Sequence, residues 1–107
     1  VRFEADWDGE DVVLRWETAF ENCRAFRLYR ATPAQPYDQA VQVGPDIMAT
    51  GIGSSYAYTD RAPGSGQWRY WLVEVGGTGR ENDVHGPFET PLGGGLYRQF
   101  LPLVMYE

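Results

Sequence analysis

The chain has 107 residues, with 15 acidic side chains against nine basic ones, all arginine, and a formal charge of −6. This length fits one soluble domain with a single core, and the absence of lysine excludes Schiff-base and other lysine-dependent chemistry. The acidic balance disfavours nucleic acid as a partner, and the apolar runs fall short of the ~18 residues that a transmembrane helix needs, so we expect no membrane insertion.

The first third of the chain contains three stretches with the alternation of apolar and polar residues that is typical of strands. Residues 3–7 and 11–18 form the first two, and the acidic residues 8–11 between them predict the turn of an antiparallel hairpin. A third strand is predicted over residues 26–31, and it ends before Pro33, because proline cannot donate a ladder hydrogen bond.

The remaining strands are separated by turns rich in glycine and proline. Two short, weak strands are predicted around Val41–Val43 and Ile47–Met48, on either side of Gly44 and Pro45. Three longer ones follow, over residues 54–59, 67–75 and about 80–90, the last with an irregularity at Gly86 and Pro87. About seven strands at this spacing predict an all-β, antiparallel sandwich.

The C-terminal part differs in composition from the predicted sandwich. Residues 93–95 are three glycines that form a flexible linker, and residues 96–107 form a separate tail that is apolar on both faces of an extended chain. Water would disfavour such a segment, so it packs on its own domain or adds as a strand to a neighbouring subunit. The predicted anchors of this tail are Phe100, Leu101, Leu103, Val104 and Met105.

Five short segments within residues 1–92 occur in an order and spacing that resemble a known family. They are residues 13–18, 26–31, 58–60, 70–75 and 85–87, which read VLRWET, FRLYRA, YTD, YWLVEV and HGP. Together they resemble fibronectin type III-like domains of secreted bacterial multidomain proteins, and the tail resembles short YLPLV endings of exported bacterial proteins. The resemblance implies a seven-stranded immunoglobulin or fibronectin III-like sandwich with an extra C-terminal segment. It also implies an extracellular or cell-surface location, and core positions for Trp16, Phe26, Leu28, Tyr70 and Leu72.

One strand departs from the family pattern, in which the residues that point away from the core are usually polar. Here Trp71 and Val73 are apolar, and Val75 continues the same face. Arg27 and Tyr29 on the neighbouring strand would complete a patch with the composition of protein interfaces. The alternatives are a slightly apolar surface, or a local bulge that turns Trp71 inward.

No residue set predicts catalysis or metal binding. The acidic loop with Asp6, Asp8, Glu10 and Asp11 lacks the spacing of a calcium-binding hand, and a solvated turn explains the same residues. His85 is the sole histidine and no nucleophile elbow accompanies it. The single cysteine, Cys23, is predicted to be structural. We therefore expect no catalytic residue, no metal and no cofactor.

The leading hypothesis is a non-catalytic extracellular structural or interaction module. In this hypothesis the chain is a subunit or terminal domain of a cell-surface or filament-like assembly, and its partners are copies of itself or other protein subunits that dock through the tail. The alternative is a carbohydrate-binding accessory module of a secreted enzyme, in which exposed aromatic residues stack on sugars; the candidates are Trp7, Tyr56, Trp68 and Tyr97. A small hydrolase is the third hypothesis.

Overall fold

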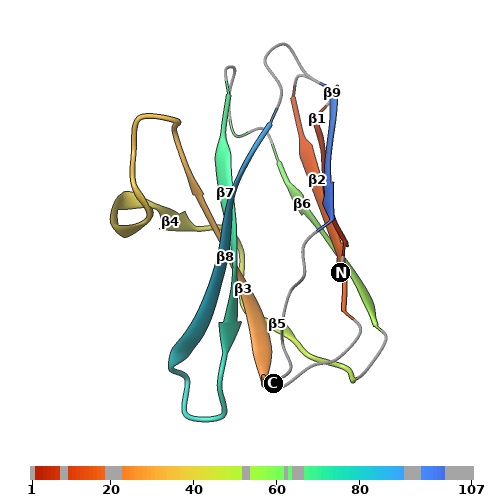
Figure 1. The fold of residues 1–107 in the computed structure, drawn as a ribbon, viewed down its shortest axis with the longest axis vertical. Coiled ribbons are helices and arrows are strands. Elements are labelled where there is room, and N and C mark those ends of the chain that lie inside the picture. The colour runs from red at the N-terminus through yellow and green to blue at the C-terminus, as the bar shows by residue number, and fades with distance from the viewer. Residues whose placement is uncertain are drawn as a thin grey trace.

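The computed structural model places two antiparallel sheets face to face (Figure 1). It describes residues 2–7, 10–18, 23–51, 54–61, 63, 67–90 and 95–100, with Arg2 and residues 95–100 described as backbone only. One sheet has the strand order β6-β2-β1-β9, with bounds Ser55–Asp60, Val12–Glu17, Arg2–Trp7 and Gly95–Phe100. The other has the order β4-β3-β7-β8, with bounds Val41–Gln42, Ala25–Ala31, Arg69–Val75 and Glu81–Glu89. The short strand β5 (Ile47–Met48) also pairs with β3, and a 3-10 turn, η1 (Tyr37–Gln39), precedes β4.

The predicted N-terminal hairpin is confirmed. Strands β1 and β2 are antiparallel neighbours, with Phe3 opposite Trp16 and Trp7 opposite Val12. Every second residue of β2 is buried, from Val12 to Trp16, while the residues between them are half-buried or exposed. The period of two in the sequence therefore places one face of this hairpin against the second sheet.

The core lies between the two sheets, and the five core positions named from the sequence are all part of it. Each large side chain buried there contributes about 1.5–3 kcal/mol relative to an exposed position. The cluster consists of Phe3, Ala5, Trp7, Val12, Leu14, Trp16, Phe26, Leu28, Val43, Tyr56, Tyr70, Leu72 and Phe88. Stacked pairs such as Phe3 with Phe88, whose ring centroids are 4.1 Å apart, join the two layers.

Strand β8 leaves regular pairing at the predicted irregularity. Gly86 has φ +130° and precedes a cis peptide bond to Pro87, and the register with β7 shifts between Tyr70 and Leu72. A Cβ at Gly86 would lie 2.8 Å from the backbone oxygen of Tyr70 and 3.0 Å from the ring of Trp71. Glycine is therefore required where β8 crosses this part of β7.

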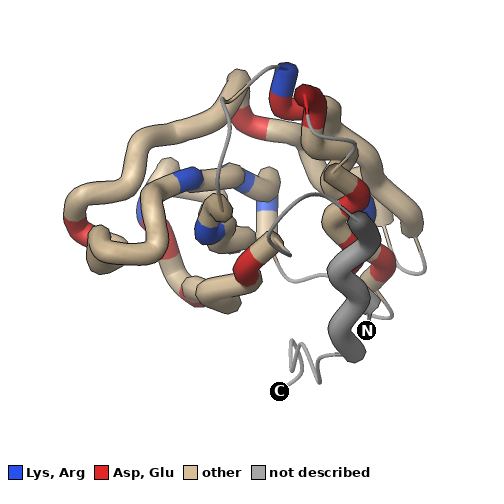
Figure 2. The backbone as a smooth tube through the Cα atoms, turned by 90° about the horizontal axis from the view of Figure 1, so that it is seen from above, with Lys and Arg blue, Asp and Glu red and all other residues tan. Residues whose placement is uncertain are grey.

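The all-β prediction is confirmed, and the strand count needs one qualification. In the part of the chain that is described, seven strands have six residues or more, and β4 and β5 have two each. The seventh long strand is β9, which belongs to the predicted tail and pairs with β1 of its own domain, one of the two alternatives for this segment. Gly95, assigned to the linker from the sequence, is the first residue of β9. Arginine and acidic positions occur in both layers of the sandwich (Figure 2), so neither sheet carries a single sign of charge.

Candidate functional site

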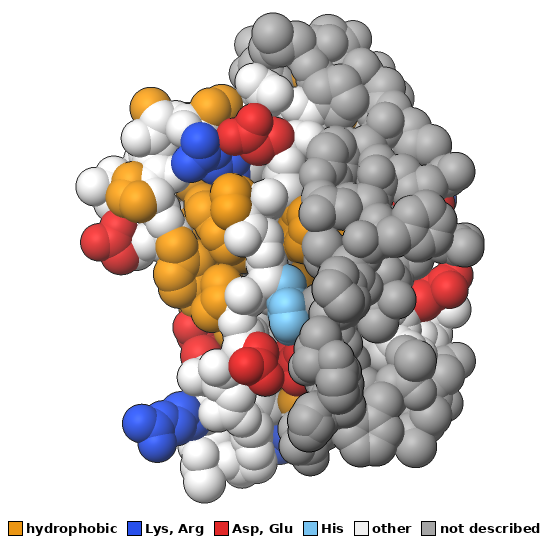
Figure 3. All heavy atoms as spheres, viewed as in Figure 1, with side chains coloured by type: hydrophobic (Ala, Val, Ile, Leu, Met, Phe, Trp, Pro, Cys, Tyr) orange, Lys and Arg blue, Asp and Glu red, His pale blue; other side chains and the backbone are white. Residues whose placement is uncertain are grey.

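The predicted interface residues of the sandwich lie together, on the outer face of the five-stranded sheet. In the pairing of β3 with β7, Arg27 is opposite Val73 and Tyr29 is opposite Trp71. Val75 follows two residues after Val73 and shares its face. These five residues therefore share one face of the sheet, as predicted from the sequence. Hydrophobic side chains gather on this side of the molecule, near η1 and β7 (Figure 3).

The exposure that we expected for three of these residues is wrong. Trp71 is 4% exposed, and Val73 and Val75 are fully buried. The ring of Tyr37, in η1, packs edge-on against Trp71 with the centroids 5.6 Å apart, and it packs against Tyr29 at 5.4 Å. The apolar residues that looked like a partner surface are therefore covered by the chain itself. Their role in binding a partner stays a prediction, and at most 4% of any of these three residues is exposed.

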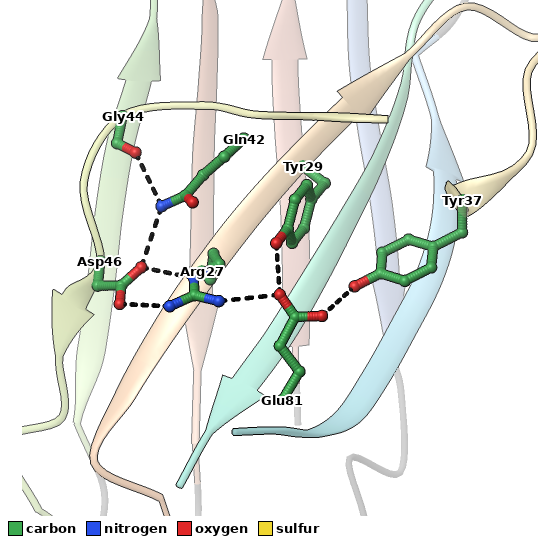
Figure 4. Close-up of polar contacts among 7 residues, drawn as sticks. All are labelled: Arg27, Tyr29, Tyr37, Gln42, Gly44, Asp46 and Glu81. Carbon is green, nitrogen blue, oxygen red and sulfur yellow. Dashed lines mark hydrogen bonds and ion pairs between the residues drawn. The ribbon is translucent and has the colours of Figure 1, made fainter. Parts of the chain in front are cut away.

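A carboxylate from β8 organises the polar side chains around this covered face (Figure 4). Glu81 accepts hydrogen bonds from three donors on two other elements, β3 and η1. The Tyr37 hydroxyl donates to Oε1 at 2.6 Å, and Arg27 Nη1 donates to Oε2 at 2.9 Å. The Tyr29 hydroxyl also donates to Oε2. Glu81 thus connects η1 and β3 to the edge strand β8 and holds the Tyr37 ring against Trp71.

The other side of Arg27 binds the turn between β4 and β5. Its Nε donates to Asp46 Oδ1 at 2.7 Å and its Nη2 donates to Oδ2 at 2.8 Å, which is a two-point contact between planar groups. Gln42 Nε2 donates to Asp46 Oδ1 at 3.0 Å and to the Gly44 carbonyl at 3.1 Å. Arg27 therefore connects two acidic side chains that are far apart in the sequence. We call the set Arg27, Tyr29, Tyr37, Asp46 and Glu81 the outer clamp.

The protonation of the outer clamp follows from these contacts. The hydrogen bonds from Arg27 lower the pKa of Asp46. Burial acts to raise the pKa of Glu81, but the hydrogen bonds from Tyr29, Tyr37 and Arg27 outweigh it, so this pKa is also lowered. Burial and the bond to Glu81 raise the pKa of both Tyr29 and Tyr37. At neutral pH both acids are charged and accept hydrogen bonds, and both phenols are protonated and donate them.

This protonation state makes the outer clamp a structural connection. Glu81 and Asp46 have their oxygens occupied by donors, and all three nitrogens of Arg27 that can donate are engaged. A general base would need an unoccupied carboxylate oxygen facing a substrate. The clamp instead holds η1 and the β4–β5 turn on the outer face of the sheet.

The predicted tail residues are described only in part. Residues 95–100 form β9, which pairs antiparallel with β1, so that Gly95 is opposite Trp7 and Phe100 is opposite Arg2. Phe100 is therefore the last residue of this strand. The other predicted anchors, Leu101, Leu103, Val104 and Met105, lie outside the described residues, as do residues 91–94.

The residues considered for sugar binding lie mostly inside the sandwich. Trp7 is 4% exposed and Tyr56 is 8% exposed. Trp68 packs against the core and carries the guanidinium group of Arg30 over its ring at 5.2 Å. Tyr97 lies in β9, opposite Ala5. Three of the four candidates thus serve packing.

The other chemically active residues are also placed. His85 Nε2 lies 2.8 Å from Glu74 Oε2, and the Glu74 side chain is 3% exposed. Cys23 packs against the core. In the acidic loop, Asp11 makes a long ion pair of 3.9 Å with Arg61, and Asp8 lies outside the described residues. Within the described ranges, no group of three His, Cys, Asp or Glu side chains has the arrangement of a metal site.

Sequence reasoning missed three of the five residues of the outer clamp. Tyr37 lies between the third predicted strand and the short strand around Val41–Val43, in a stretch that was given no role from the sequence. Asp46 and Glu81 are separated from Arg27 by 19 and 54 residues, so no local pattern connects them.

Comparisons of the chain with protein-family models, with curated proteins and with solved structures give no match. None of the helical structure in the described residues has the length and apolar character to cross a bilayer.

Proposed function

We propose that this chain is a non-catalytic interaction module of an extracellular or cell-surface assembly. In this proposal residues 1–92 form a fibronectin type III-like sandwich, and the C-terminal segment joins the module to copies of itself or to other protein subunits by strand addition. The proposal rests on the sequence resemblance described above and on the way in which the structure seats β9.

The strand order supports the fibronectin-like assignment. In immunoglobulin-like sandwiches the first, second and fifth main strands share a sheet, and the third, sixth and seventh form the other. Counting β4 as the fourth main strand, this chain places β1, β2 and β6 in one sheet and β3, β7 and β8 in the other, next to β4. The fold class alone does not define a function, so the functional argument depends on the C-terminal strand.

The observation that carries the functional proposal is the position of β9. This strand is added to the outer edge of β1, where six consecutive residues of each strand are paired. An unpaired edge strand presents backbone donors and acceptors that any strand of suitable length can use. If β9 of one copy paired with β1 of another copy in this register, the same backbone pairing would join two modules.

A disulfide cross-linking experiment tests whether this pairing forms between copies. Glu4 is opposite Arg98, and directly opposed residues in antiparallel strands have Cα atoms about 4.5–5.5 Å apart, within the range that a disulfide spans. Two chains would be made in a Cys23→Ser background, one with Glu4→Cys and one with Arg98→Cys. They would be unfolded, mixed, refolded and oxidised. We expect a covalent heterodimer of one chain of each kind.

The controls separate exchange from random oxidation. Arg80 is exposed in the β7–β8 turn and is not part of the β1–β9 pairing, so Arg80→Cys mixed with Glu4→Cys should give little heterodimer. Light scattering of the unmodified chain at rising concentration should show dimers or larger species. If the mixture yields no more heterodimer than the Arg80 control, and the chain scatters as a monomer at every concentration, β9 docks only on its own β1 and the proposal is wrong.

A further inference from the structure

A polar cleft opens at the other edge of the four-stranded sheet, where β6 ends beside the turn that follows β4. Its volume is about 430 Å³, within the range of small-molecule sites. It is lined by Arg30, Gln42, Val43, Gly44, Tyr58, Thr59, Asp60 and Arg61. Because β6 and β9 are the opposite edges of the same sheet, the cleft is separate from the strand-addition surface.

The acidic group in the cleft wall is already neutralised. The Asp60 side chain is 6% exposed, and Arg30 Nη1 donates to both of its oxygens at 2.7 Å. The buried Tyr70 hydroxyl donates to Oδ2, also at 2.7 Å. Both oxygens of Asp60 therefore already accept hydrogen bonds from the chain itself, and Arg30 balances the charge of Asp60 at close range.

Arg30 has hydrogen-bonding capacity left over. Only Nη1 is used, and among the described residues no hydrogen bond engages Nε or Nη2. The Trp68 ring, 5.2 Å from the guanidinium carbon, restricts the plane of the group, and 24% of the side chain is exposed. The edge of a guanidinium formed by Nε and Nη2 matches the two oxygens of a carboxylate.

The rest of the lining adds positive charge and donors. Arg61 stands at the rim with its side chain 80% exposed, and its ion pair to Asp11 is long, at 3.9 Å. Two arginines and one aspartate give the lining a net charge of +1 in a chain of net charge −6. Tyr58 and Thr59 also line the cleft. The lining thus offers donors and positive charge, which selects an anion over a cation.

We propose that this cleft binds a carboxylate, held at two points by Nε and Nη2 of Arg30 and attracted by Arg61 at the rim. The carboxylate belongs either to a small organic acid or to an acidic side chain of a polypeptide. The inference concerns a different edge of the sandwich from the proposed function and does not depend on strand exchange.

NMR of the full 15N-labelled chain tests the proposal through the Arg30 side-chain Nε–H and the Thr59 amide. Two probes separate the sources of the carboxylate: sodium acetate, and a Gly-Glu-Gly peptide blocked at both ends. Sodium chloride at equal ionic strength and the matching Gly-Gln-Gly peptide are the controls. We expect saturable shifts with both carboxylates and not with the controls. Tighter binding of the peptide assigns the cleft to an acidic polypeptide, and equal binding assigns it to a free carboxylate.

Three variants locate the binding on the arginines. Arg30→Lys keeps the charge but loses the two-point edge, and we expect the affinity for acetate, followed at the Thr59 amide, to fall about tenfold. Arg61→Gln should weaken binding about twofold to fivefold through the loss of a rim charge. Arg80→Gln, an equal charge change at an exposed site outside the cleft, should leave the affinity unchanged.

Two results would overturn the proposal. The first is a set of shifts that follow ionic strength and do not saturate. The second is an Arg30→Lys chain that binds acetate as tightly as the unmodified chain does. If Arg30→Lys does not fold, the comparison of Arg61→Gln with Arg80→Gln decides, because equal affinities of these two variants would remove the cleft as the binding site.

Discussion

Removing the Glu81 side chain should destabilise the sandwich far more than its position at the edge of a sheet indicates. Glu81 lies in β8, and its side chain is 29% exposed. The substitution Glu81→Ala leaves Tyr37, Tyr29 and one nitrogen of Arg27 without their acceptor. Arg27 keeps its two bonds to Asp46, so the loss is confined to the contacts of Glu81.

The magnitude follows from the three contacts. A hydrogen bond to a charged group contributes about 1.5–3 kcal/mol when it is buried, and water replaces part of this where the group is partly exposed. We therefore assign about 1 kcal/mol to each bond, and expect the free energy of unfolding to fall by about 3 kcal/mol. For a domain of this size the same loss lowers Tm by roughly 10–20 °C.

The assay is urea unfolding followed by tryptophan fluorescence, with Glu89→Ala as the matched control on the same strand. Glu89 makes one ion pair, to Arg69 Nε at 2.7 Å, and its side chain is 38% exposed. An exposed single pair contributes less than about 1 kcal/mol, so Glu89→Ala should change the unfolding midpoint little. Equal losses for the two variants would refute the reasoning, because the three donors of Glu81 would then contribute no more than one surface pair.

Two further predictions use the same denaturation assay. The lowered pKa values of Glu81 and Asp46 mean that their stabilisation is complete above the ordinary carboxyl range near pH 4 and is lost as the pH falls through the folded-state values; the unfolding midpoint should drop on acidification, and less steeply in Glu81→Gln. An equal acid dependence in that variant would contradict this. Gly44→Ala should cost about 1–3 kcal/mol, since Gly44 has φ +70° and a Cβ there would lie 2.2 Å from the Tyr58 hydroxyl. Gly77→Ala, where a Cβ meets nothing within 4 Å, is the control, and a similar cost at both sites would refute the steric argument.

The strands were predictable because each one carries its own signal. In β2, alternation from Val12 to Trp16 defines the buried face without reference to the rest of the chain. The same rule failed for β7, whose residues from Tyr70 to Val75 are buried on both faces. Alternation assumes that the second face of a strand meets water. Here the ring of Tyr37 packs on Trp71. The sequence of residues 69–75 contains no signal for this contact, because Tyr37 lies about thirty residues earlier in the chain.

The polar sites were less predictable than the core for a related reason. Apolar residues bury themselves against any apolar partner, so their periodicity is sufficient to place them. A hydrogen-bonded network needs particular atoms at particular distances, and its members can come from any part of the chain. Glu81 is one of 15 acidic residues, and its sequence neighbours do not distinguish it from Asp83 or Glu89. Only the register of β3, β7 and β8 brings it beside Arg27.

The two arginines of β3 show how one strand can carry a structural connection on one face and a binding site on the other. Arg27 points outward and Arg30 lies toward the second sheet, and each forms close ion pairs with an acid distant in sequence. All three nitrogens of Arg27 are engaged, so no edge of this group offers two unbonded nitrogens to a carboxylate. Arg30 uses Nη1 alone. The number of donors left after the fold has formed, and not the presence of an arginine on a surface, therefore decides which face can recognise an anion. The cleft at the β6 edge therefore recognises the anion, and the outer clamp contributes to stability.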